Sequence, residues 1–233
     1  MIYNEYNSDL KRLIKKDGKK VKILLTAFDP FGGDTINPAI EALNLINLEL
    51  ENLEIIKLIV PTVFYKSIDT VTEVIEKEQP DVVLCIGQAG GRKEITPERV
   101  AINLDDARIC DNEGNQPIDT KIYEDGESAY FATIPIKAIV QKIAEANLPS
   151  TVSNSAGTFV CNHLMYGVLY YISKHHYNMK AGFLHIPYMI EQVKHMQDKP
   201  ALPLDQIVQG IELAIEAIAC NKVDLRMTGG TEC

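Results

Sequence analysis

The sequence predicts an α/β protein, a single-domain α/β/α sandwich with a mainly parallel, mixed central sheet. Short and nearly continuous runs of Val, Ile and Leu indicate strands that are covered on both faces. Segments with apolar residues at helical spacing separate these runs. A chain that alternates in this way is typical of an open, parallel sheet. With 233 residues, 46% of them hydrophobic, the chain can bury one such core.

Each expected element has a local reason. The buried strands are the apolar runs VKILLTAF (21–28), EIIKLIV (54–60), DVVLCIG (81–87) and AGFLHIP (181–187). A helix is expected to begin at Pro38, because proline suits the first helical position. The segments with helical periodicity are 38–48, 64–79, 134–147 and 202–220.

Residues 87–133 interrupt this alternation. The stretch has little periodicity and much Gly, Asp, Asn and Pro. Irregular stretches of this length are uncommon inside compact domains and tend to be functional. A surface excursion that contains a hairpin is the alternative interpretation, and the spacing alone does not choose between the two.

The charge is unevenly distributed along the chain. The net charge is −9, yet residues 1–20 hold six of the 23 basic and only three of the 32 acidic side chains. We interpret residues 1–20 as a basic N-terminal arm with a tendency to fray, and residues 21–233 as one domain. The acidic domain would repel phosphate backbones and anionic lipids, so we expect neither nucleic-acid nor membrane partners.

The N-terminus and the cysteines indicate the compartment. The opening residues lack the continuous apolar region of a secretory signal, and no segment has the length needed to span a bilayer. The five cysteines are odd in number, irregularly spaced and without a CxxC pair. This pattern favours a reduced, cytoplasmic protein with free thiols.

Cys161 stands where a run of small residues meets an apolar helix, in SNSAGTFVCNHLMYG (153–167). In the first turn of that helix, the helix dipole would stabilise a thiolate, and the free N–H groups could hold an oxyanion. An intracellular cysteine is more often an inert core residue, as we expect for Cys85 and Cys220. The local sequence leaves both interpretations of Cys161 open.

A nucleophilic cysteine needs a base, and His185 is the preferred candidate. It lies near the carboxyl end of an expected strand, the edge at which open α/β sheets bind ligands. His163 is two residues from Cys161 on the same helix, so it points to a different face. Since a histidine in an apolar strand is often a hydrogen-bonded core residue, the pairing of Cys161 with His185 remains a hypothesis at this point.

Glycine loops and metal-ligand patterns give weaker signals. FDPFGGD (28–34) and GQAGGR (87–92) follow strands, as phosphate loops do, but neither forms GxGxxG or ends in GK[ST]. Cys161 and His163 have the wrong spacing for ligands on one helix, and CDNEGNQP (110–117) does not match a calcium loop. We therefore expect no metal site.

Several segments, taken in order and spacing, resemble the pyroglutamyl-peptidase I (pyrrolidone-carboxylate peptidase) family. They are LLTAFDPFGG, NPA, VPTVFYKS, GQAGGR, ITPERVAINLDDARI, DNEGNQP, AGTFVCNH and GFLHIPY. The similarity runs from about Val21 to the C-terminus. It implies a cytoplasmic cysteine peptidase that removes N-terminal pyroglutamate (5-oxoproline) from peptides. It further implies a single catalytic α/β domain, a homotetramer and no cofactor.

The resemblance also assigns roles to individual residues. It implies that Cys161 is the nucleophile, that His185 is the general base and acid, and that Glu98 orients the histidine. Arg108 is associated with oxyanion stabilisation, and the reaction passes through a thioester. The substrate pocket falls on Phe28, Phe31, Asn37, Thr62, Gln88, Ile109, Phe159 and Val160.

A neutral lactam ring needs apolar walls, one donor and one acceptor. We expect the Asn37 side chain to donate to the ring carbonyl and a main-chain carbonyl near Gln88 to accept from the ring N–H. Such a pocket would reject proline and open-chain glutamate, because a buried polar partner or charge would be left unpaired. We also expect His185 and the helix start to favour the thiolate of Cys161.

Two other classes of function stay open. The first is a phosphorylase or nucleotide-using transferase with the glycine loops as anion sites, which phosphate or nucleotide would stabilise. The second is an α/β binding protein or an inactive relative. For that class, Cys110 or Cys233 would be alkylated faster than Cys161.

Overall fold

The structure is a computed structural model that describes residues 20–230. Apart from Lys20, the predicted basic arm lies outside the described residues, and so does Cys233. The first half of the domain alternates strand and helix as predicted. It consists of β1 (Val21–Phe28), α2 (Pro38–Leu45), β2 (Leu53–Val60), α3 (Lys66–Glu78) and β3 (Val82–Gln88).

The irregular stretch after β3 contains a hairpin, as its alternative interpretation expected. It carries three short strands, β4 (Thr96–Pro97), β5 (Val100–Ile102) and β6 (Ala129–Phe131). β5 and β6 pair in antiparallel fashion, and residues 103–128 form the long connection between them. This connection contains Arg108 and Ile109, two of the residues predicted to serve the site.

The second half of the domain begins with two helices, and the second of them is apolar almost all round. Its elements are α4 (Ile136–Glu145), α5 (Val160–Lys174), β7 (Lys180–Ile186), β8 (Tyr188–Met189), α6 (Ile190–Val193), β9 (Ala201–Leu202) and α7 (Leu204–Cys220). α5 lies under the sheet with most of its side chains buried. The prediction of a buried helix that has Cys161 in its first turn is therefore confirmed.

The central sheet has the strand order β2-β1-β3-β7-β4. The first four strands are parallel, and the short β4 joins β7 in antiparallel fashion. The sheet is thus mixed and mainly parallel, as predicted. Since parallel strands present their carboxyl ends at the same edge, the loops after β1, β3 and β7 meet there.

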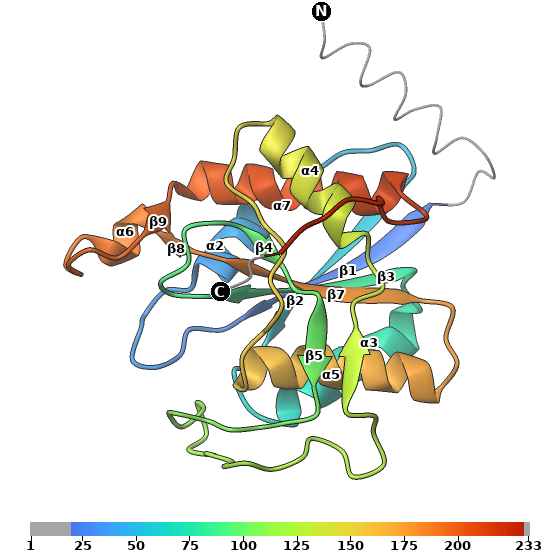
Figure 1. The fold of residues 1–233 in the computed structure, drawn as a ribbon, viewed down its shortest axis with the longest axis vertical. Coiled ribbons are helices and arrows are strands. Elements are labelled where there is room, and N and C mark those ends of the chain that lie inside the picture. The colour runs from blue at the N-terminus through green and yellow to red at the C-terminus, as the bar shows by residue number, and fades with distance from the viewer. Residues whose placement is uncertain (1–19, 231–233) are drawn as a thin grey trace, which may run out of the picture.

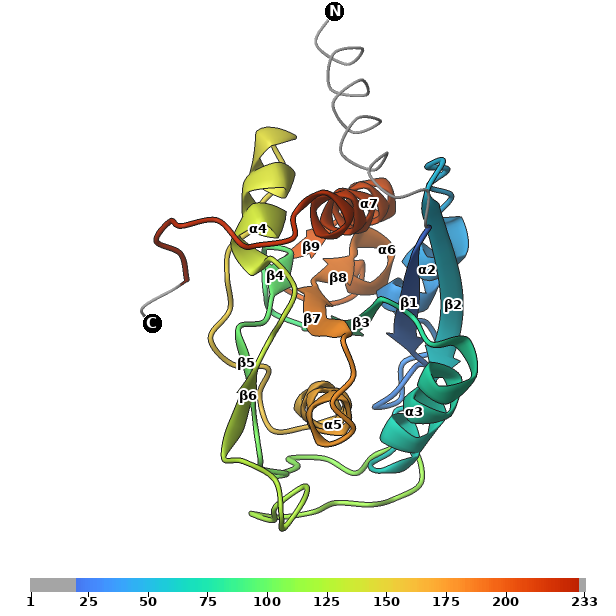
Figure 2. The same cartoon turned by 90° about the vertical axis from the view of Figure 1, so that its right-hand side faces the viewer.

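Helices cover both faces of the sheet, with α4 and α7 on one side and α3 and α5 on the other (Figures 1 and 2). Successive side chains of a strand point to opposite faces. In β7, Leu184 belongs to the core under α7, whereas Phe183 belongs to the core around α5. His185 follows Phe183 by two residues and therefore faces α5, the helix that carries Cys161.

Within residues 20–230, the helices are too short or too polar to qualify as a membrane span.

Candidate active site

A cavity of about 690 Å³ lies at the carboxyl ends of β3 and β7. Its walls come from the loops that follow β1 and β3, from the connection between β5 and β6, and from the start of α5. Seven residues predicted to form the site line it together: Phe31, Gln88, Arg108, Ile109, Phe159, Cys161 and His185. The sheet edge thus brings together residues from distant parts of the sequence.

Cys161 is the second residue of α5 and lies against the backbone of β3. A Cβ atom added at Gly87 would lie 3.0 Å from the Cys161 Sγ and 2.7 Å from the Phe183 ring. Gly87 is also the register partner of His185 on the neighbouring strand. The absence of a side chain at Gly87 therefore lets the sulfur approach the sheet beside His185, a requirement that the sequence analysis missed.

His185 and Glu98 form a buried hydrogen-bonded pair. The His185 Nδ1 lies 2.7 Å from the Glu98 Oε1, and the two residues are 3% and 0% exposed. A carboxylate partner assigns the proton to Nδ1, which leaves Nε2 as the nitrogen that can accept a proton. Among the described residues, no hydrogen bond occupies this Nε2. The Glu98 backbone N–H also donates to the Phe183 carbonyl, which fixes the acid beside β7.

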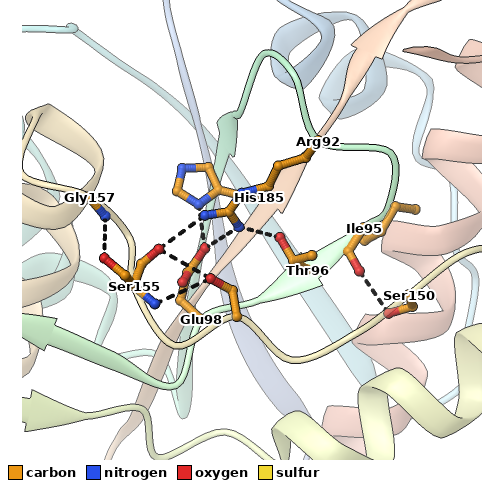
Figure 3. Close-up of polar contacts among 9 residues, drawn as sticks. Arg92, Ile95, Thr96, Glu98, Ser150, Ser155, Gly157 and His185 are labelled. Atoms are coloured by element: carbon orange, nitrogen blue, oxygen red, sulfur yellow. Dashed lines mark hydrogen bonds and ion pairs between the residues drawn. The ribbon is translucent and has the colours of Figure 1, made fainter. Parts of the chain in front are cut away.

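Arg92 is a member of this cluster that the sequence analysis did not identify. Its Nη1 donates to the Glu98 Oε1 at 2.6 Å and to the Thr96 Oγ1 at 2.5 Å. Its Nη2 donates to the Ser155 carbonyl at 3.0 Å (Figure 3). The available signal was an arginine at the end of GQAGGR, six residues before an acid. In a loop, such spacing does not predict a contact.

The electrostatics of the site favour neutral side chains at two positions. Burial lowers the pKa of His185 from 6.5, although the Glu98 carboxylate opposes this effect. Burial raises the pKa of the Cys161 thiol to about 12, and the negative charge of Glu98 adds to the rise. The free protein therefore holds a neutral thiol beside a neutral imidazole. The sequence favoured an ionised sulfur, and desolvation of the thiol reverses that expectation.

Glu98 stays ionised despite its burial. Burial alone favours the neutral acid, but the hydrogen bond and charge of His185, together with the charge of Arg92, outweigh it. The net effect is a pKa of Glu98 below its ordinary value. The cluster therefore places a carboxylate behind the imidazole, where it can stabilise an imidazolium that forms during a reaction.

Asn37 and Thr62 lie outside the cavity wall. The Asn37 Oδ1 accepts from the Ala39 N–H at 2.9 Å, and its amide donates to the Asp29 carbonyl at 3.2 Å. The Thr62 hydroxyl donates to the same carbonyl at 2.9 Å. Asn37 is thus the N-cap of α2, a role that was not predicted from the sequence. Its predicted contact with a ring carbonyl stays a prediction.

Phe28 and Val160 also lie outside the cavity wall. The Phe28 ring packs 6.3 Å from the Phe183 ring, in the core beneath the site. Val160 is 0% exposed and begins α5. The side chains of both residues support the wall from behind.

His163 forms a second buried pair, with Asp105. The His163 Nδ1 lies 2.8 Å from the Asp105 Oδ2, and both side chains are 0% exposed. The His163 Nε2 accepts the Tyr65 N–H at 2.7 Å. His163 is absent from the cavity wall, so the prediction that it points away from the site of Cys161 is confirmed. The sequence did not indicate its partner.

Cys85 and Cys110 lie outside the cavity wall, and Gly90 in the second glycine loop makes room for a neighbouring side chain. Cys85 is buried, and burial raises its pKa to about 12, whereas Cys110 is exposed and outside the cavity. Gly90 leaves room for Tyr188, whose hydroxyl would lie 2.3 Å from an added Cβ atom. Among residues 20–230, no cluster of three or more His, Cys, Asp or Glu side chains could hold a metal ion.

Known proteins are similar to this chain in sequence and in fold. Residues 21–221 match the family model described as Pyroglutamyl peptidase. The chain is 55% identical over 213 residues to the pyrrolidone-carboxylate peptidase of Clostridium perfringens, covering 91% of this chain and 100% of that protein. It is 59% identical over 211 residues to pyrrolidone-carboxylate peptidase 1 of Streptococcus pneumoniae, covering 90% and 99%.

The fold is similar to the crystal structure of pyroglutamyl peptidase I from Bacillus amyloliquefaciens. The TM-score is 0.87 at 48% sequence identity, and the match covers 90% of this chain and 100% of that one.

Proposed function

The chain belongs to the pyroglutamyl peptidase family, and from this premise we propose that it releases N-terminal pyroglutamate from peptides with Cys161 as the nucleophile. It is a pyroglutamyl peptidase, a cysteine-type hydrolase, and peptides with an N-terminal pyroglutamate are the substrates that fit this family. One observation supports the assignment of residues. Cys161 and His185 line the same cavity, and Glu98 bonds His185 from behind.

The cavity suits a flat and mostly apolar lactam ring. Phe31, Ile109 and Phe159 supply apolar walls, and the Phe31 and Phe159 rings lie 6.1 Å apart. The main-chain carbonyl of Gln88 is our candidate acceptor for the ring N–H. An open-chain glutamate would bring its charge against these walls, and proline would lack the ring carbonyl. Each loss leaves a buried group unpaired, at a cost of about 1–3 kcal/mol.

The attack begins from the neutral pair. Because the thiol of Cys161 is protonated in the free enzyme, His185 acts as a general base and removes the proton as the sulfur approaches the acyl carbon. The imidazolium that forms is stabilised by the Glu98 carboxylate at 2.7 Å. The proton therefore moves when substrate is present, and no preformed ion pair is required.

The start of α5 and Arg108 can stabilise the oxyanion. The side chain of the N-cap residue, Phe159, makes no cap hydrogen bond, so the N–H groups of Val160 and Cys161 have no acceptor from it. Arg108 is an exposed cation on the cavity wall, opposite in charge to a developing oxyanion. His185 then protonates the departing amine, and water, deprotonated by His185, hydrolyses the thioester to release pyroglutamate.

We also propose that the enzyme needs no cofactor, is cytoplasmic and forms a homotetramer. These proposals rest on the family resemblance and on the free thiols of the described residues. Light scattering of the purified protein tests the tetramer directly, and a monomer would contradict it.

Hydrolysis of a pyroglutamyl-amide reporter by the reduced protein tests the function. We expect Cys161→Ala to abolish hydrolysis and Cys110→Ala to leave it unchanged, because the exposed Cys110 lies outside the cavity. Iodoacetamide should abolish wild-type activity while it modifies Cys161. An inactive wild type would refute the function, and an active Cys161→Ala would refute the nucleophile.

A further inference from the structure

We propose that Arg92 is a positioning residue of this active site, whose single guanidinium holds both the Glu98 carboxylate and the loop that precedes α5. The inference rests on the proposed function, because Glu98 and Cys161 matter to it as catalytic residues. Arg92 itself is assigned no contact with the reacting atoms.

The contacts of Arg92 add a side-chain link between two segments whose backbones already pair at Glu98 and Ser153. The Nη1 reaches Thr96 in β4 at 2.5 Å and the Glu98 carboxylate at 2.6 Å. The Nη2 reaches the Ser155 carbonyl at 3.0 Å, in the loop that leads to Cys161 (Figure 3). The guanidinium thus links the acid of the proposed triad to the segment that presents the nucleophile. A displacement of about 1 Å in such a site can lower turnover about 10²-fold.

The burial of Glu98 creates the need for this cation. Glu98 is 0% exposed, and both strong contacts, from His185 and Arg92, fall on its Oε1. Among the described residues, no hydrogen bond of good geometry reaches the Oε2. The nearby Ser153 hydroxyl helps to lower the pKa of Glu98, but it donates its hydrogen bond to the Ser155 carbonyl at 3.1 Å. A buried carboxylate with only a neutral imidazole beside it would be costly.

The charge of Arg92 also acts on the whole triad in one direction. It lowers the pKa of Glu98, of His185 and of Cys161. Each effect favours the form that the chemistry uses: the carboxylate, the neutral imidazole and the thiolate. Removal of the cation should therefore move the acid limb of the pH profile upward and make the thiol harder to ionise.

Lysine can supply the charge but not the geometry. The planar guanidinium of Arg92 donates to three acceptors from two nitrogens, whereas an ammonium is a compact point charge. Arg92→Lys should consequently keep the pH dependence and lose part of the turnover. Arg92→Met removes both contributions at similar length, so the two variants separate charge from geometry.

The experiment compares Arg92→Met, Arg92→Lys and Arg99→Met with the wild type. Arg99 is the matched control, because its side chain donates to Asn154 and to the Gly229 carbonyl without a contact to Glu98. For each protein we would measure kcat and KM for the reporter against pH. The rate at which iodoacetamide modifies Cys161 against pH and the thermal midpoint would be measured on the same samples.

We expect Arg92→Met to lower kcat about 10²-fold, with KM changed by less than about threefold. Its acid limb should rise by about one pH unit, and the alkylation of Cys161 at a fixed pH should slow about tenfold. Arg92→Lys should lower kcat about tenfold and keep both pH dependences, and Arg99→Met should match the wild type.

Three outcomes would overturn the inference. They are an Arg92→Met variant with unchanged kcat and pH dependence, a rise in KM alone, which would make Arg92 a binding residue, and an equal loss in Arg99→Met. If Arg92→Met does not fold, Arg92→Lys decides, since wild-type turnover in that variant would exclude the geometric role. An inactive wild type would refute the proposed function, whereas the alkylation profiles would still decide the role of Arg92.

Discussion

The domain contains two buried pairs of a carboxylate and a histidine that look alike by distance. Glu98 and His185 lie 2.7 Å apart, and Asp105 and His163 lie 2.8 Å apart. In both pairs the imidazole Nδ1 meets the acid, and all four side chains are almost fully buried. His163 is even on the same helix as Cys161.

The two pairs differ at the other nitrogen of the ring. The Nε2 of His163 accepts the Tyr65 N–H at 2.7 Å, and the rings of Phe64 and Tyr65 pack edge-on against the imidazole. His185 lies on the cavity wall, and among the described residues no hydrogen bond occupies its Nε2. A buried acid–histidine pair is therefore not by itself evidence of catalysis. The two pairs differ in whether the Nε2 already has a hydrogen-bond partner among the described residues. The Nε2 of His163 is bonded to the Tyr65 N–H and so fixes the start of α3.

The largest expected difference between the pairs is in turnover. His185→Ala should lower kcat for the pyroglutamyl reporter by about 10³-fold or more, because the general base is lost. His163→Ala should keep kcat within about threefold, counted per folded molecule. Reporter kinetics with the folded fraction determined by circular dichroism would check this. The comparison would be wrong if His163→Ala lost as much turnover as His185→Ala.

The space beside His185 can be closed without a change to any titratable group. In Gly87→Ala the new Cβ would lie 2.7 Å from the Phe183 ring and 3.0 Å from the Cys161 Sγ, so one of them must move. We expect kcat to fall about 10²-fold with an unchanged pH profile.

Gly229→Ala is the control for this change, since among the described residues its new Cβ would meet only Val152 at 3.5 Å, an ordinary contact. Steady-state kinetics of both variants would suffice. Wild-type kcat in Gly87→Ala would show that the sulfur does not need this space.

The pair of Asp105 and His163 should make a large contribution to the free energy of unfolding. In His163→Ala the Asp105 carboxylate loses its only hydrogen-bond partner on Oδ2 among the described residues, and its Oδ1 already has none. Leaving one member of a buried pair unpartnered costs about 3–5 kcal/mol in the free energy of unfolding.

Urea unfolding of His163→Ala and of the wild type would measure this loss. An equal midpoint for the two proteins would mean that the pair contributes little to the fold.

The smallest expected effect is on how kcat/KM and the free energy of unfolding depend on pH. Burial lowers the pKa of His185 below 6.5, and the base must be neutral to act, so the acid limb of kcat/KM should lie below pH 6.5. Between pH 6.5 and the folded-state pKa of His185, the unfolded chain binds more protons than the folded one. The free energy of unfolding should therefore fall as the pH decreases from 6.5 through the folded-state pKa.

A kcat/KM profile for the reporter, recorded from about pH 5 to pH 9, would locate this limb. A limb above pH 7 would indicate that the charge of Glu98 outweighs burial at His185.

Local sequence patterns identified the framework closely. The run of apolar residues at 21–28 became β1 with the same bounds, and the strand expected at 181–187 became Lys180–Ile186. The helix expected at 134–147 is shorter, Ile136–Glu145, because periodicity does not mark where a helix ends. Asn37 was predicted only as a pocket residue, and its role as the N-cap of α2 was missed.

The sequence by itself determined the long strands and helices and placed Cys161 in the first turn of α5, because these follow from periodicity and from local backbone chemistry. It also identified the family through its motifs. Only the tertiary structure decided that Arg92 bonds Glu98 and that Gly87 makes room for the sulfur of Cys161. It also decided that both ring nitrogens of His163 are hydrogen-bonded, one to Asp105 and one to Tyr65. Those contacts join segments far apart in the chain, and desolvation at the assembled site sets the protonation of Cys161. Neither the contacts nor the burial exist until the sheet and its helices have packed.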